Sequence, residues 1–260
     1  MPLTFYVLLS LTGAVVGFFS GLVGIGGGIL MFPLLYYLPP VFGFEVIGIK
    51  NITGLTMVQG FFASFTAMLF YKQCRLVNKP LVFVLGLSIF LSSLTGSFVS
   101  KTVADKTLLF IFGILAFTAS VMMFIPRSYE KDDLTEESVD FNKTGACLTG
   151  IFIGFLLGLV GQAGAFIIIP ILLYILKIPL RVALGSTLAI GLFSSTAGLI
   201  GKAATGQVPL YMSGALVLGA IPAAKIGSYI SKKTNTKLLR WILAMIISAT
   251  SIKIWSDIFF

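Results

Sequence analysis

The sequence lacks histidine entirely and is poor in cysteine and acid. It has two cysteines, Cys74 and Cys147, and nine acidic residues among 260. Without histidine or a spaced cluster of cysteines, we expect no zinc site and no other metal or cofactor. A protease would need a Ser–His pair, a His–Glu metal motif or two buried acids, and none can be assembled. The sequence therefore predicts a protein that is not an enzyme.

Charge of either sign is also scarce. Only 10% of the residues are charged and 57% are hydrophobic, whereas a soluble domain carries about 25% charged residues. Polar side chains are too few to cover the outside of a soluble fold, so a bilayer must be the solvent. The net charge of +9 comes from Lys and Arg at the ends of apolar segments. That position indicates orientation in a membrane rather than binding of nucleic acid.

Apolar segments run along the whole chain. A membrane-spanning helix needs about 20 predominantly apolar residues. Segments of this kind lie at 46–70, 81–99, 107–125, 182–203, 208–230 and 238–258. Two further stretches, 5–38 and 144–176, are too long for one straight crossing, and small residues cluster near the middle of each. The predicted fold is an all-α polytopic membrane protein of eight segments, two of them broken.

A charged linker divides the chain almost in half. Nine of the eighteen residues from 126 to 143 are charged. The linker separates an N-terminal membrane repeat, 1–125, from a C-terminal one, 144–260. Residues 21–33 align with 158–170 without a gap and share six identities, and 96–101 match 227–232. The order and spacing of these blocks indicate an internal duplication.

The basic residues decide between parallel and inverted repeats. If each long segment crosses once, the halves share an orientation and their basic loops face opposite solvents. If each long segment enters and returns, the halves are inverted and twelve basic residues share one side. Because positive loops face the cytoplasm, we expect inverted repeats in the cell (inner) membrane, with these loops and the acidic linker cytoplasmic. The twelve are Lys72, Arg75, Lys79, Arg127, Lys131, Lys143, Lys177, Arg181, Lys232, Lys233, Lys237 and Arg240.

The glycine-rich breaks are the first candidate site. Residues 21–28 contain five glycines, and each destabilises a helix interior by roughly 1 kcal/mol relative to alanine. A broken backbone in hydrocarbon survives only when it is buried in protein or lines a cavity. Free N–H groups where a half-helix restarts suit an anion; the alternative is close packing of helices on small residues. The candidate residues are Gly24, Ile25, Gly26, Gly27 and Gly28, then Gly161, Gln162, Ala163 and Gly164.

Polar residues within the apolar segments are the second candidate set. Hydroxyls and amides donate hydrogen bonds to an anion as readily as they bond neighbouring helices. The candidates are Asn51, Thr53, Gln59, Ser186 and Thr187. Lys225 stands well inside a segment and is a possible anion-attracting charge; alternatively its ammonium extends to the interface. The lysines left to the other face and the membrane are Lys50, Lys101, Lys106, Lys202, Lys225 and Lys253. Apart from Asp257, at the end of the last segment, no acid lies within a segment, and the chain has no histidine. We therefore expect a neutral or anionic substrate rather than a cation.

The first glycine motif resembles that of the TauE/SafE family of sulfite-exporter-like membrane proteins. The residues that carry the resemblance are 24–28 with Pro33, 161–164 with Pro170, and 185–188 at the start of the following segment. It covers essentially the whole chain. The resemblance implies secondary transport of sulfite, sulfonates or related small anions, commonly export.

The predicted function is therefore alternating-access transport of a small sulfur-containing oxoanion, most simply sulfite, around a site near the membrane midplane. Its partners would be that anion and the lipid bilayer. Two other interpretations stay open. One is a passive anion channel, and the other is a non-transporting membrane module with a sulfur relay through Cys74 and Cys147.

Overall fold

The computed structural model describes residues 2–24, 28–73, 77–124 and 141–259. Three predicted features fall partly or wholly outside this range. The charged linker is described only from residue 141. Ile25, Gly26 and Gly27 of the first glycine segment, and Cys74 with Arg75, lie outside the described residues.

The described chain is entirely helical and contains no strand. The helices are α1 (Leu3–Val23), α2 (Gly28–Val41), α3 (Ile49–Gln73), α4 (Lys79–Val99), α5 (Asp105–Phe124), α6 (Lys143–Val160), the 3₁₀ helix η2 (Gln162–Ile167), α7 (Ile168–Tyr174), α8 (Leu180–Ala204), α9 (Leu210–Lys233) and α10 (Thr236–Phe259). Eight of the described helices are long and apolar enough to cross a membrane, and α2 and α7 are shorter. The prediction of an all-α protein with eight long segments is confirmed.

Local sequence sets several helix ends. Asn78 caps α4 by accepting a hydrogen bond from the Leu81 N–H at 2.9 Å, and Pro80 follows in the first turn. Asn142 caps α6 in the same way through the Gly145 N–H, at 3.0 Å. Helix α1 ends where Gly24 adopts a φ of +70° and its N–H returns to the Ser20 carbonyl. Left-handed backbone at the residue after a helix favours glycine, which has no Cβ to clash.

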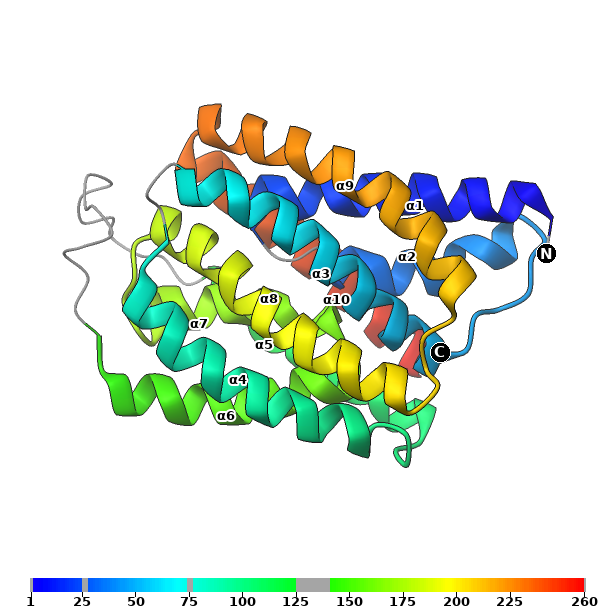
Figure 1. The fold of residues 1–260 in the computed structure, drawn as a ribbon, viewed down its shortest axis with the longest axis horizontal. Helices are drawn as coiled ribbons and strands as arrows, with labels where there is room; N and C mark the ends of the chain where they lie inside the picture. Colours follow the sequence, from blue (N-terminus) through cyan, green and yellow to red (C-terminus); the bar gives the residue numbers. More distant parts are fainter. Residues whose placement is uncertain (1, 25–27, 74–76, 125–140, 260) are drawn as a thin grey trace.

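The first pair of helices enters the bundle and returns. The rings of Phe5, at the start of α1, and Phe44, just beyond α2, lie 5.1 Å apart. Helix α2 therefore leads back to the end of the bundle where α1 began (Figure 1).

In the second half, α6 followed by η2 and α7 has the same arrangement as α1 followed by α2. Helices α4 and α8 begin at one end of the bundle, since the Asn78 N–H donates to Ser186 Oγ at 3.1 Å. Helix α6 runs beside α4 in the same direction, because Gly150 lies against Leu85 and Gly158 against Ser93. Helices η2 and α7 must therefore lead back to the end where α6 began, since α8 starts there.

Each half packs a first helix against a helix of the other half. Gly13, Gly17 and Gly21 of α1 lie against the backbone of Leu216, Ala220 and Ala224 of α9. Helix α6 meets α4 through Gly150, Gly154 and Gly158, and Gly158 is the residue aligned with Gly21 in the sequence repeat. Glycines at four-residue spacing allow two helices to approach closely in a membrane.

The centre of the bundle is made by helices that correspond in the two halves. Helix α3 crosses α8 in the opposite direction: Thr53 contacts Lys202, and Met57 lies against Gly198. Helix α5 likewise meets α10 in reverse, with Ser120 Oγ 2.8 Å from Ser248 Oγ and the Trp255 Nε1–H donating to the Gly113 carbonyl. Because they cross at the centre, α3 and α8 are more completely buried than the other spanning helices.

The outer faces of the bundle are apolar. On α4 the exposed side chains include Phe83, Leu87 and Leu91, which are one helical turn apart. Such rows would be unfavourable in water and match the hydrocarbon of a bilayer.

Two glycines of α9 provide a matched test of the close packing. A Cβ added to Gly219 would overlap the Ser10 carbonyl of α1, whereas one added to Gly214 meets nothing within 4 Å. We expect Gly219→Ala to destabilise the protein by about 1–3 kcal/mol through overpacking. Gly214→Ala should leave stability unchanged or raise it by up to about 1 kcal/mol. Melting of the detergent-purified variants measures both, and equal melting temperatures would contradict the observed packing.

Candidate functional site

The two glycine segments are anchored on the central helices of the opposite halves. Gly24 packs on α8, where an added Cβ would lie 2.8 Å from the Leu184 carbonyl oxygen. Gly161 packs on α3, where an added Cβ would lie 2.6 Å from the Thr53 carbonyl oxygen. Both glycines have positive φ, +70° and +83°. Neither position accepts a side chain, so each segment depends on glycine to reach the centre.

Gln162 lies at the crossing of α3 and α8. Its side chain fills the space in front of Gly60 of α3, where an added Cβ would overlap the glutamine Cγ. On the other side its Nε2–H donates to the Gly191 carbonyl of α8 at 3.3 Å. An added Cβ at Gly191 would also lie 3.5 Å from Ser64 Oγ. Two glycines without side chains therefore make room for one amide between the central helices.

Buried polar atoms without a protein partner are found on the elements that form this crossing. Seven buried side-chain atoms among the described residues make no hydrogen bond, and they belong to six residues. Five of these residues are Gln59 and Ser64 on α3, Gln162 on η2, and Thr187 and Ser194 on α8. The sixth, Ser20, lies in the last turns of α1.

The five residues at the crossing carry a definite chemistry. Each unsatisfied buried polar group costs about 1–3 kcal/mol, so such a group requires an explanation. The set contains three hydroxyls and two amides and no carboxylate. Four of the unpartnered atoms, the three hydroxyls and Gln59 Nε2, can donate hydrogen bonds to a small oxoanion, and the Oε1 atoms of Gln59 and Gln162 are acceptors.

Three of the predicted residues belong to this cluster: Gln59, Gln162 and Thr187. Two others are buried but already bonded. Thr53 Oγ1 donates to the Lys50 carbonyl at 2.8 Å, and Ser186 Oγ accepts the Asn78 N–H.

The remaining predicted residues lie elsewhere or contribute backbone. Asn51 is exposed at the start of α3, and Lys225 is exposed on α9. Gly24, Gly28 and Gly161 are buried backbone, and Ala163 and Gly164 form part of η2. An exposed lysine on a membrane helix fits the interpretation in which its ammonium extends to the interface.

Lys202 is a charged residue that the sequence analysis did not single out as a site candidate. It lies in the last turn of α8 and is completely buried. Its position near a segment end is typical of an interfacial lysine, so hydropathy alone did not mark it as buried. The helical spacing carries a signal that could have found it, because Gly191, Ser195, Gly198 and Lys202 follow one another at four, three and four residues, on one side of the helix.

The ammonium of Lys202 is held by oxygen atoms from several elements. Lys202 Nζ donates to Thr53 Oγ1 at 2.9 Å and to the Leu159 carbonyl at the end of α6 at 3.1 Å. It also donates to Ser100 Oγ at 2.8 Å and to Gln207 Oε1 at 3.3 Å. None of these partners is charged. Leu159 is three residues before Gln162, so the lysine adjoins the segment that carries the central amide.

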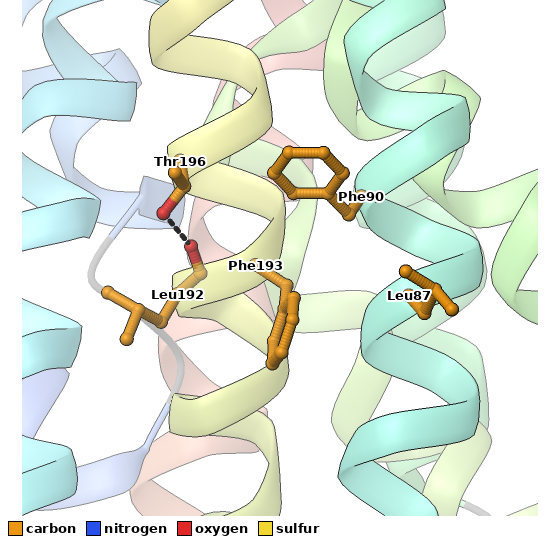
Figure 2. A pocket seen from close by; sticks show the side chains of 5 residues that line it. All are labelled: Leu87, Phe90, Leu192, Phe193 and Thr196. Atoms are coloured by element: carbon orange, nitrogen blue, oxygen red, sulfur yellow. Dashed lines mark hydrogen bonds between the residues drawn. The ribbon is translucent and has the colours of Figure 1, made fainter.

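A groove between α4 and α8 has a different character. Figure 2 shows its lining residues, and its volume is about 300 Å³. The hydroxyl of Thr196 donates to the Leu192 carbonyl at 2.6 Å, and the other lining side chains are apolar. The lining residues are Leu87, Phe90, Leu192, Phe193 and Thr196. With no free donor, this groove is unsuited to an anion.

Comparison with known proteins gives a consistent result. The family described as "Sulfite exporter TauE/SafE" matches residues 9–254. A probable membrane transporter protein of Bacillus subtilis is 24% identical, over 93% of this chain and 94% of its own. One from Methanocaldococcus jannaschii is 27% identical, over 92% of this chain and 91% of its own. No solved structure shows a significant match.

Proposed function

The chain belongs to the sulfite exporter TauE/SafE family of membrane transporters, and on that basis we propose that it carries a small sulfur-containing oxoanion, most simply sulfite, by alternating access. The observation that carries this proposal is the set of buried polar side-chain atoms without a partner on α3, η2 and α8, the elements of the central crossing. Substrate sites of repeat-built transporters lie near the midplane, between the repeats.

The composition of the cluster favours an oxoanion over a cation. Gln59 offers an unpartnered amide N–H group, and Ser64, Thr187 and Ser194 offer hydroxyls. Gln162 contributes the second N–H of an amide whose first N–H donates to the Gly191 carbonyl. These donors would replace part of the water around sulfite, whose oxygen atoms accept several hydrogen bonds. A cation site within the membrane would call for carboxylates, and the cluster has none.

The proposed movement relies on inverted repeats formed by 1–125 and 144–260. Their support is the direction of corresponding helices, because α3 is antiparallel to α8 and α5 is antiparallel to α10. The aligned sequence blocks lie at the α1–α2 break and the α6–η2–α7 break, and at the ends of α4 and α9. By order along the chain, α3 then corresponds to α8 and α5 to α10. Rocking of one half against the other would then expose the central cluster to each side in turn.

We propose an orientation with the starts of α4, α6, α8 and α10 at the cytoplasmic surface. Arg181, at the start of α8, reaches the Thr234 carbonyl at the end of α9, so the basic ends of these helices gather together.

This orientation predicts a labelling pattern in a variant with Cys74 and Cys147 replaced by serine. In intact cells a membrane-impermeant maleimide should label Glu45→Cys, which lies beyond α2. It should label Lys177→Cys, between α7 and α8, only after the membrane is opened. Labelling of Lys177→Cys in intact cells would contradict this orientation and indicate the opposite one.

The transport function is tested with purified protein in liposomes. Uptake of sulfite, thiosulfate, sulfate, an organosulfonate and a short carboxylate is compared with uptake into protein-free liposomes. We expect saturable, protein-dependent flux that is fastest for sulfite. A protein that moves none of the five anions would contradict the function, and a preference for the carboxylate would contradict the substrate class.

A further inference from the structure

Lys202 is a buried charge with no counter-charge among its partners. Its three N–H groups are shared among four oxygen atoms, those of two hydroxyls, one amide and one backbone carbonyl. Buried charges in proteins are normally paired, because neutral oxygens recover only part of the hydration that is lost. A site of this kind favours an anion, and the proposed substrate is one.

Three of the four partners are firmly placed. Thr53 lies in α3 and Leu159 in α6, and Ser100 directly follows α4. The hydroxyl hydrogens of Thr53 and Ser100 are engaged with the Lys50 and Ser97 carbonyls, at 2.8 and 2.7 Å. These two side chains therefore present only lone pairs to the ammonium.

Gln207 is the partner that can be exchanged. Its contact with Lys202 is the longest of the four, 3.3 Å, and it belongs to the connection between α8 and α9 rather than to a helix. Its Nε2 donates to Thr205 Oγ1 at 2.7 Å and, at the longer distance of 3.3 Å, to Ser100 Oγ. If the amide turned away from Lys202, its oxygen would free one direction of the ammonium, and its N–H could bond the incoming anion instead.

The position of Lys202 connects this site with the central cluster. Lys202 is in the last turn of α8 and contacts Thr53 in the first turns of α3. Its contact with the Leu159 carbonyl places it beside the segment that carries Gln162. Its contact with Gln207 places it beside the connection between α8 and α9. The lysine thus lies between the end of the bundle and the crossing of α3 and α8.

We propose that Lys202 is a second anion-binding site, in which a small oxoanion replaces the amide oxygen of Gln207 on the ammonium before or after it occupies the central cluster. This inference rests on the proposed transport function. In this proposal Lys202 attracts the anion, and the Gln207 amide oxygen occupies the ammonium while no anion is bound. A lysine that only ties helices together would have neither role.

The first test is Lys202→Met, which removes the charge but keeps much of the length. We expect the KM for sulfite uptake to rise at least tenfold, because the charge that attracts the anion is lost. The oxygen atoms left without the ammonium will also lower stability, which the melting temperature of the same preparation reports. Lys202→Arg should restore part of the affinity. Lys106→Met, at an exposed position in α5, is the matched control and should behave as wild type. A folded Lys202→Met variant with a wild-type KM would overturn the proposal.

The second test is Gln207→Glu, which does not depend on the folding of a charge-deleted protein. The new carboxylate should occupy Lys202 as a tethered anion, raise the melting temperature and raise the KM for sulfite at least tenfold. A purely structural lysine predicts the higher melting temperature with an unchanged KM, and that result would overturn the proposal.

A binding measurement separates this proposal from the transport function. Sulfite should raise the melting temperature of the purified wild-type protein, and it should do so much less in Gln207→Glu. If the wild type shows this melting shift but no flux, the transport function is contradicted and the Lys202 site is not. An active wild type whose affinity is unchanged in both variants contradicts the Lys202 site alone. An equal melting shift in wild type and Gln207→Glu also overturns the Lys202 site.

Discussion

Gly161→Ala is expected to leave little folded protein. Gly161 has φ +83° and ψ −174°, a region that is essentially restricted to glycine and costs other residues about 1–3 kcal/mol. The new Cβ would also lie 2.6 Å from the Thr53 carbonyl oxygen, and overpacking of this kind costs about 1–3 kcal/mol. The two backbones belong to η2 and the central helix α3, so neither can move without disturbing the crossing.

Gly43→Ala is the control for this variant. Gly43 has a similar φ of +77°, but an added Cβ would meet nothing within 4 Å. Gly43→Ala should therefore be destabilised only by the unfavourable positive φ, without a steric overlap. The yield of monodisperse protein after heating measures both, and equal yields would show that the contact between Gly161 and α3 is not needed for folding.

Gln162→Leu is expected to reduce sulfite flux at least tenfold while the protein stays folded. The substitution removes the amide that lies between Gly60 and Gly191, together with an Oε1 atom that has no partner. Because a buried group without a partner is destabilising, its loss should leave stability unchanged or raise it by about 1 kcal/mol. Flux into liposomes and melting of the same preparation separate the two effects.

Thr196→Val is the matched control for Gln162→Leu. It also removes a polar side chain close to the centre, but on the side of α8 that faces the apolar groove, where the hydroxyl donates only to Leu192 (Figure 2). Flux should be unchanged. Wild-type flux in Gln162→Leu would exclude the crossing of α3 and α8 as the substrate site.

Properties that depend on single segments could be predicted from the sequence. The thickness of the bilayer sets the length of a spanning helix, so the eight long helices follow from hydropathy. The two over-long stretches likewise indicated additional short helices, and α2 and α7 are found there.

The inward face of each helix could not be predicted in the same way. Asn51 and Gln59 lie in the same helix, yet the first is exposed and the second is buried. Both faces of α3 are largely apolar, so hydropathy does not reveal which polar residue meets α8. Contacts between distant segments decide it, as when Gly60 and Gly191 leave room for Gln162.

Lys202 illustrates the same difficulty for a charge. Near a helix end, sequence favours the interface, because a lysine there can reach water. Burial of Lys202 results from three contacts distant in the chain, with Thr53, Ser100 and Leu159. Lys225 is the converse case, since it stands further inside its segment but is exposed.

Counterflow of labelled sulfite tests the central claim most directly. Liposomes with purified protein are loaded with a high concentration of unlabelled sulfite and diluted into a trace of labelled sulfite. A carrier with one site that faces each side in turn predicts that the label accumulates inside above its equilibrium level before it declines. This overshoot should be absent in Gln162→Leu. Entry of label that only approaches equilibrium, at a rate proportional to concentration, would contradict alternating access and favour a channel.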